Sequence, residues 1–167
     1  MDEPITVRAY TWDMTAIQTQ PQGRQRHVGK VFASITITNH ADEIRAADGT
    51  IREDQVRRIH LDRILVDTGA NTLCLPQSLV ERLGLPVLKK AFASTAAGVR
   101  PVVVHDDARI ALMGREGTYE CLALPEDTEP LLGLLPLEGM GLEPDLQNEA
   151  LRVLPDGPTR ETYITIY

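Results

Sequence analysis

The sequence predicts an all-β protein, a barrel or a sandwich built from short strands with one or two short helices. Apolar and polar residues alternate with a period of two in several short segments, turn-forming residues separate these segments at close intervals, and few segments have helical periodicity. The 167 residues are 43% hydrophobic and 25% charged, as in one ordinary globular domain, taken here as 1–167. Because aromatic residues make up only 4%, the core must consist mainly of Val, Ile, Leu and Ala.

The first third of the chain contains one clear strand signal. Apolar residues alternate weakly at 5–9 and clearly at 31–38, which predicts a half-buried strand, whereas 18–27 is rich in Gln and Arg and predicts an exposed loop. We expect residues 1–29 to be an N-terminal extension of a core at about 30–154.

Residues 39–58 are polar and predict an excursion from the barrel. Asp48-Gly49 is a turn signal. Thr50 and Glu53 have the spacing of a capping box, which predicts a short helix over 51–56.

The rest of the chain alternates between strands and two short helical segments. Pro76 suits a first helical position and Gly84 suits a left-handed helix end, so a helix is predicted over 76–83. The stretch 130–141 is apolar and has room for about two helical turns. The predicted strands are 59–66, 90–95, 99–104, 108–113, 118–124, 151–154 and a C-terminal strand within 160–167.

The charge balance argues against anionic partners. Lys and Arg number 17 against 24 Asp and Glu, a net charge of −7, and no basic run is longer than a pair, which argues against nucleic acid or an anionic membrane as a partner. No stretch approaches the roughly 20 apolar residues of a membrane span. The acidic N-terminus lacks the layout of a signal peptide, so a cytoplasmic location is expected.

Cysteine and histidine usage predicts neither a disulfide framework nor a metal site. The chain has two cysteines, and its four histidines are scattered without ligand spacing, so we expect no metal and no organic cofactor. Cys74 lies in an apolar run and is expected to be a buried, inert thiol.

The segment 64–76 carries the clearest chemical signal. An apolar strand leads to Asp67-Thr68-Gly69, and a second apolar strand follows at once, which places a carboxylate on a tight turn between buried strands. The tripeptide alone favours an ordinary strand-ending turn in which Asp67 accepts backbone hydrogen bonds. The apolar runs on both sides favour a functional carboxylate.

Two motifs together resemble the retropepsin-like aspartic proteases, in particular their single-domain bacterial members. The first is Leu65-Val66-Asp67-Thr68-Gly69-Ala70 with Leu73 to Pro76 behind it. The second runs from Glu129 through Leu132-Gly133-Leu134 to Glu138 and on to Asp145. The resemblance covers roughly 30–154 and implies a closed β-barrel with a flap hairpin.

The resemblance implies peptide-bond hydrolysis by two carboxylates that share one proton. Since the chain has a single such motif, it implies a homodimer in which Asp67 is the base in one subunit and the acid in the other. Thr68 would then hydrogen-bond across the dimer axis, Gly69 would offer its carbonyl to the substrate, and Ala70 and Asn71 would line the cleft. The partners are therefore a second copy and a peptide or protein substrate.

A flap is expected over 92–100, where two strands surround a tip of small residues. A plain surface hairpin is the alternative. The substrate-facing residues of the flap would be Ser94, Thr95, Ala96, Ala97 and Gly98.

The second motif departs from the retroviral pattern. Leu134 and Leu135 follow Gly133, where retroviral members often carry Arg and then Asp or Asn. The position of that arginine's acidic partner is the neutral Asn71, so both halves of the ion pair are absent and no buried charge is left unpaired. This departure keeps two alternatives open, which are an inactive dimerisation or peptide-binding module and a purely structural domain.

Overall fold

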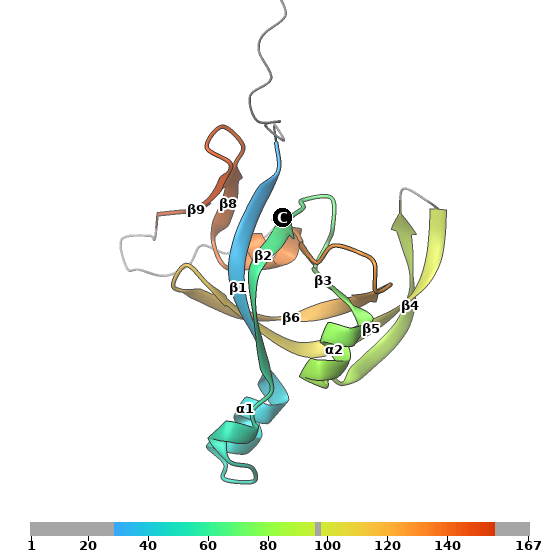
Figure 1. The fold of residues 1–167 in the computed structure, drawn as a ribbon, viewed down its shortest axis with the longest axis vertical. Helices are drawn as coiled ribbons and strands as arrows, with labels where there is room; N and C mark the ends of the chain where they lie inside the picture. Colours follow the sequence, from blue (N-terminus) through green and yellow to red (C-terminus); the bar gives the residue numbers. More distant parts are fainter. Residues whose placement is uncertain (1–28, 96–97, 156–167) are drawn as a thin grey trace, which may run out of the picture.

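The computed structural model describes residues 29–95 and 98–155 (Figure 1). Four sequence predictions lie outside these residues. They are the alternation at 5–9, the loop at 18–27, the flap tip Ala96-Ala97 and the C-terminal strand within 160–167.

The main sheet closes into a ring, which confirms the all-β prediction. Its strand order is β1-β2-β7-β3-β6-β5-β4, and β1 also pairs with β5, so six strands close the ring and β4 lies outside it on β5. The strands are β1 (Val31–Asn39), β2 (Arg58–Val66), β3 (Leu73–Pro76), β4 (Val87–Thr95), β5 (Gly98–Leu112), β6 (Arg115–Leu124) and β7 (Leu131–Leu132). Two further strands, β8 (Leu142–Asp145) and β9 (Ala150–Val153), pair in a separate two-stranded sheet.

Two predicted strands form one continuous strand in the structure. The segments 99–104 and 108–113 both belong to β5, where the pairing register with β6 shifts between His105 and Ala108. Asp107 has a positive φ of 61° at this irregularity. The extra residues of such a bulge interrupt the alternation of the sequence, so one long strand has the pattern of two.

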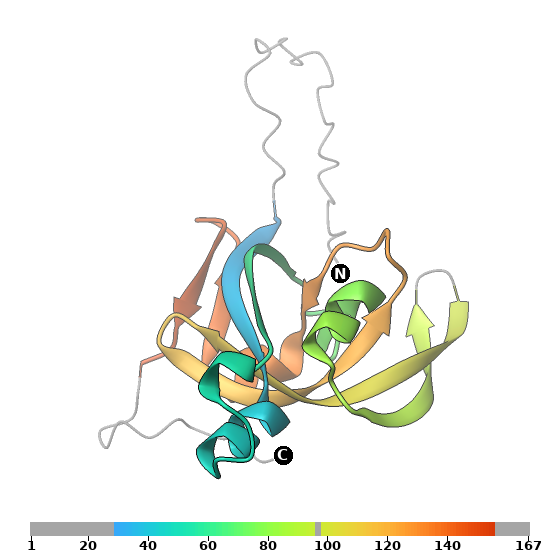
Figure 2. The same cartoon turned by 60° about the horizontal axis from the view of Figure 1, so that its bottom comes forward.

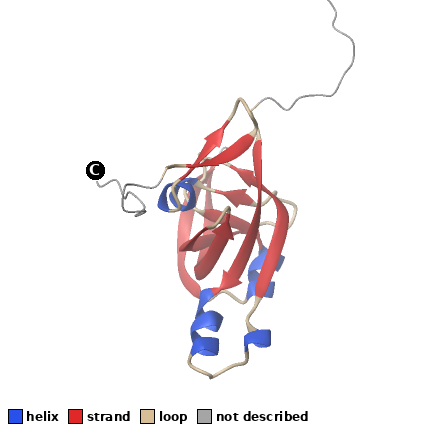
Figure 3. Ribbon diagram, turned by 90° about the vertical axis from the view of Figure 1, so that its left-hand side faces the viewer, coloured by secondary structure: helices blue, strands red, loops and turns tan. Residues whose placement is uncertain are grey.

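The described residues contain three α-helices and one 3₁₀ turn, one helix more than predicted. These are α1 (His40–Ala47), α2 (Gln77–Leu83), α3 (Leu134–Gly139) and η1 (Glu53–Gln55). Figure 3 shows α1 and η1 beyond one end of the strands. For α2 the prediction is confirmed, with Pro76 directly before the first turn and Gly84 left-handed at φ 57°.

Helix α1 was predicted only as part of a polar excursion. The Asn39 side chain accepts a hydrogen bond from Asp42 N and so caps the helix, and it also donates to the carbonyls of Leu83 and Gly84. The Thr50–Glu53 capping box was wrong. Thr50 instead bonds to Asp48, and the 3₁₀ turn starts after Arg52, whose backbone N–H is bonded by the Gln55 side chain. Polar residues cap both elements, so apolar periodicity could not reveal them.

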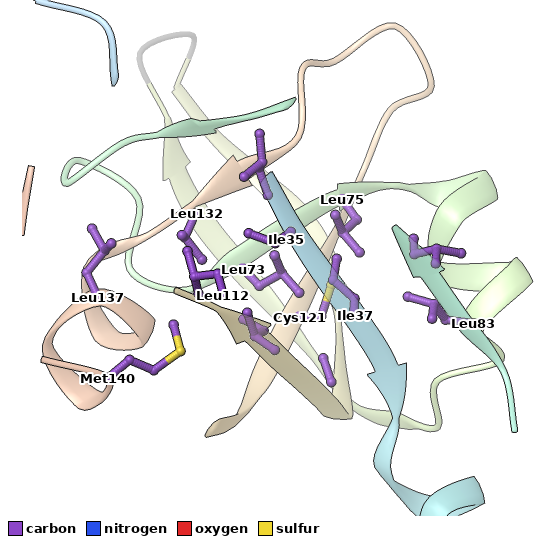
Figure 4. Close-up of a cluster of buried hydrophobic side chains, with 14 of the residues drawn as sticks. Ile35, Ile37, Leu73, Leu75, Leu83, Leu112, Cys121, Leu132, Leu137 and Met140 are labelled. Atoms are coloured by element: carbon purple, nitrogen blue, oxygen red, sulfur yellow. The ribbon is translucent and has the colours of Figure 1, made fainter. Parts of the chain in front are cut away.

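The core fills the ring with aliphatic side chains, as the scarcity of aromatic residues predicted. Figure 4 shows side chains from β1, β3 and β6 pointing toward one another, with Cys121 among them. The fully buried side chains of largest volume are Ile35, Ile37, Ile64, Leu73, Leu75, Leu83, Ile110, Leu132, Leu137, Met140, Val31 and Val80.

The two ends of β2 lead to different structures. The α1–η1 excursion precedes Arg58 at its start, and the Asp67 turn follows Val66 at its end (Figures 1 and 2). No helix in the described part of the chain has the length and apolar character needed to cross a membrane.

Candidate active site

The Asp67 turn begins where two parallel strands end together. Leu65 and Val66 of β2 pair with Leu131 and Leu132 of β7, and Asp67 N donates to Leu132 O at 3.0 Å. The backbone pairing therefore continues one residue beyond β2. It fixes the position of the Asp67 backbone while its side chain stays half-buried.

Short hydrogen bonds shape the turn itself. Gly69 N donates to Asp67 Oδ1 at 2.9 Å, and Ala70 N donates to Asp67 O at 3.0 Å. A Cβ atom at Gly69 would lie 3.1 Å from the same carboxylate oxygen, so glycine leaves room for the carboxyl group. Among the described residues no Lys, Arg or His forms an ion pair with Asp67, and Thr68 and Gly69 beside it are exposed.

The structure brings the two sequence motifs together. Leu134 N donates to Ala70 O at 2.8 Å, and Leu135 N donates to Asn71 O at 2.9 Å, so the start of α3 holds the far side of the turn. Ala70 and Asn71 thus have their carbonyls bound by α3.

Position 133 requires glycine because the backbone of the turn packs closely against it. A Cβ atom there would lie 2.4 Å from Thr72 O and 2.6 Å from Ala70 O, both backbone atoms that cannot move aside. Sequence reasoning included Gly133 in the second motif but did not identify this role.

Thr72 is a residue of the turn that sequence reasoning missed. It is buried, and its Oγ1 donates to the carbonyl of Glu120 on β6 at 2.5 Å. The available signal was a lone hydroxyl residue at the start of the apolar run Leu73-Cys74-Leu75, where burial requires a hydrogen-bond partner.

The predicted flap is a hairpin of β4 and β5. Ser94 pairs with Val99 and Thr95 with Gly98, which has a positive φ of 102°. Ser94 and Gly98 are exposed. In Figure 1 the last residues of β4 and the first residues of β5 lie apart from the loop that follows β2. The structure thus brings residues 67–71 together in one turn, and the described flap residues lie elsewhere.

The thiols near the turn are protonated and buried, as expected for Cys74. Burial, with a smaller contribution from the negative charge of Asp67, raises the pKa of Cys74 to about 11. Burial also raises the pKa of Cys121, on the neighbouring strand β6. Neither thiol therefore supplies a thiolate nucleophile near neutral pH.

The described residues offer no metal centre. No group of three or more His, Cys, Asp or Glu side chains within residues 29–95 and 98–155 is placed to hold a metal ion. The chemistry available at the turn is that of a carboxyl group, a neighbouring hydroxyl and backbone amides and carbonyls.

Comparison with known proteins agrees with this geometry. Residues 60–138 match the family model described as gag-polyprotein putative aspartyl protease, a stretch that runs from β2 into α3 and includes the first motif and the second as far as Glu138. No curated protein matches the chain. The predicted resemblance is therefore confirmed over residues 60–138, where the chain is similar to the retropepsin-like aspartyl proteases.

Proposed function

We propose that the protein is an aspartic endopeptidase that works as a homodimer, with one Asp67 from each subunit. The observation that carries this proposal is the Asp67 turn itself. Its backbone is held by β7 and α3, while its half-buried carboxyl group forms no ion pair with the described residues. A carboxyl group held rigidly but left without a cation is available to exchange protons with a substrate or a water molecule.

The proposed reaction needs two such carboxyl groups that share one proton. The ionised carboxylate takes a proton from the water molecule while the water oxygen attacks the peptide carbonyl carbon. The protonated carboxyl group donates its proton to the carbonyl oxygen. The tetrahedral intermediate then loses its C–N bond as the amide nitrogen receives a proton. The products are a carboxylic acid and an amine, so the overall reaction consumes one water.

A second copy of the chain is the proposed source of the second carboxyl group. Thr68 and Gly69 are exposed beside Asp67, so a two-fold axis next to the turn can bring two copies of it together. In that arrangement the Thr68 hydroxyl hydrogen-bonds across the axis, the Gly69 carbonyl binds the substrate backbone, and Ala70 and Asn71 line the cleft.

The β4–β5 hairpin is the proposed flap, with substrate contacts from Ser94 to Gly98. An extended peptide would bind as an added strand, because backbone hydrogen bonds then recognise it whatever its side chains are. Closure of the hairpin would exclude water other than the reacting molecule.

A specific observation favours one alternative, a module that dimerises or binds peptides without turnover. Leu134 and Leu135 occupy the positions that follow Gly133, and Leu135 is 56% exposed. The turn therefore lacks the arginine pairing of the retroviral pattern, although backbone hydrogen bonds from both leucines still hold it.

The deciding experiment is cleavage of a casein-like substrate at mildly acidic pH by a preparation shown by sedimentation to be dimeric. The proposal expects cleavage that pepstatin inhibits and that Asp67→Asn abolishes without loss of the fold. A confirmed dimer that is inactive at every pH establishes the non-catalytic module instead.

Dilution tests the shared site separately. If each subunit supplies one carboxyl group, specific activity falls as the dimer dissociates. Specific activity that stays constant through the measured dissociation range rules out a site built from two copies.

A further inference from the structure

We infer that Thr72 is a positioning residue that sets the geometry of the Asp67 turn through β6. This inference rests on the proposed function, because it assigns Thr72 a role in presenting Asp67 for catalysis. It concerns a buried side chain outside the Asp67-Thr68-Gly69 motif.

The argument starts from how the loop between β2 and β3 is attached. Its first residue is fixed by the bond from Asp67 N to Leu132 O, and its middle is fixed by the bonds from α3 to the carbonyls of Ala70 and Asn71. All of these are backbone bonds, which any sequence of the same shape could make. Only Thr72, where the loop enters β3, is attached by its side chain, at 2.5 Å from Glu120 O.

The surroundings of Thr72 leave that side chain little freedom. The residue is only 6% exposed, and its backbone N and O lie against Gly133, where a Cβ would come within 2.6 Å and 2.4 Å of them. Its carbonyl also accepts a weak hydrogen bond from Cys74 Sγ at 3.6 Å. Loss of the hydroxyl would remove the side-chain attachment of the loop end to β6 and leave the Glu120 carbonyl without this donor.

The hydroxyl connects the turn to the part of the molecule that carries the flap. Glu120 lies on β6, and its side chain accepts a hydrogen bond from Lys89 of β4 at 2.9 Å. The same residue thus contacts the Asp67 loop through its carbonyl and a flap strand through its carboxylate. The Lys89–Glu120 pair is exposed on both sides, and exposed ion pairs contribute little, so the inference rests on the Thr72 hydrogen bond and not on this pair.

The test compares Thr72→Val, which keeps the shape and removes the hydroxyl, with Thr72→Ser, which keeps the hydroxyl. We expect Thr72→Val to lower kcat roughly ten-fold with KM nearly unchanged, as for loss of one hydrogen bond felt at the reacting group. Thr72→Ser should stay within about two-fold of the wild type and is the matched control. Equal kcat values for Thr72→Val and wild type overturn the inference.

Amide hydrogen exchange gives a readout that does not need turnover. We expect exchange in the 67–72 segment to rise several-fold in Thr72→Val and not in Thr72→Ser, while exchange in the core strand β1 stays unchanged. Uniformly faster exchange in both segments means that Thr72 is only structural, which overturns the inference. If the wild-type dimer has no peptidase activity, the proposed function fails, and the exchange comparison still decides whether Thr72 positions the turn.

Discussion

Two aspartates in this molecule follow the ends of neighbouring, paired strands, β1 and β2, yet their surroundings differ. Asp42, in the first turn of α1, is 2% exposed, and its carboxylate accepts three hydrogen bonds from Arg57. The shortest of these joins Arg57 Nε to Asp42 Oδ2 at 2.6 Å. Asp67 is half-buried, and its carboxylate accepts one hydrogen bond from a described residue, that of Gly69 N. The first carboxylate has its hydrogen-bonding capacity filled by a cation, whereas the second keeps capacity for other ligands.

The comparison teaches how a structural acid differs from a candidate catalytic one. The hydrogen bonds from Arg57 hold the pKa of Asp42 below its usual range, although burial acts in the opposite direction. A carboxylate held in this way stays ionised and cannot deliver a proton. A catalytic carboxyl group must instead gain and lose a proton during the reaction, which the open side of the Asp67 turn permits.

The largest expected effect separates the two acids by activity. Asp67→Asn should lower kcat/KM by about 10²–10⁴-fold, the range for losing a general acid or base, with little change in Tm. Asp42→Asn should leave kcat/KM nearly unchanged at a temperature where it is folded. Peptidase assays and thermal melts of both variants check this, and full activity in Asp67→Asn contradicts the assignment.

Stability should show the reverse order. Asp42→Asn removes the charge that Arg57 binds and should lower the free energy of unfolding by about 3 kcal/mol, the lower end of the range for a broken buried pair, because Arg57 itself is partly exposed. Urea unfolding measures the change. A loss as large in Asp67→Asn would show that the Asp67 turn is also structural.

Packing at the turn gives the next effect. Gly133→Ala places a Cβ against the backbone of Ala70 and Thr72 and should destabilise the fold by about 1–3 kcal/mol, the usual range for overpacking. The folded fraction of this variant should also have lower peptidase activity, because the turn that carries Asp67 must shift to make room for the Cβ atom. Gly114→Ala, at a turn with open space around it, is a control for packing, although its positive φ adds some strain of its own.

The pH dependence of stability should follow Asp42. Because its pKa is lower in the folded state, its stabilising contribution is complete above the unfolded value, 3.8, and is lost as the pH falls through the lower folded value. The Tm difference between wild type and Asp42→Asn should therefore hold at pH 5 and shrink well below pH 4. The mildly acidic pH of the proposed peptidase reaction lies above the pH range in which Asp42 loses its stabilising effect. A Tm difference that grows as the pH falls would contradict the stabilising role assigned to the Asp42 carboxylate.

The smallest effect concerns the second arginine near Asp42. Arg45 lies 3.8 Å from Asp42 Oδ1 and is more than half exposed, so Arg45→Ala should change the free energy of unfolding by less than about 0.5 kcal/mol. Urea titration measures this against Arg57→Ala. A large loss in Arg45→Ala would mean that the two arginines share the role assigned to Arg57.

The sequence alone determined the β-rich class, the strand that leads to Asp67 and the presence of the two motifs. Alternation at 31–38 and the apolar run before Asp67 depend on burial of one strand face, which neighbouring residues encode directly. The helix between Pro76 and Gly84 was also predictable, because proline and glycine restrict the backbone locally.

The tertiary structure alone decided which residues hold the turn. Gly133 and Thr72 lie 61 positions apart in the numbering, and the pairing of β7 with both β2 and β3 brings them into contact. The Asp42–Arg57 pair likewise depends on the path of the excursion from α1 to β2. Contacts between distant segments leave no periodic signal in a single sequence. The roles of these residues can therefore be identified only from the tertiary structure.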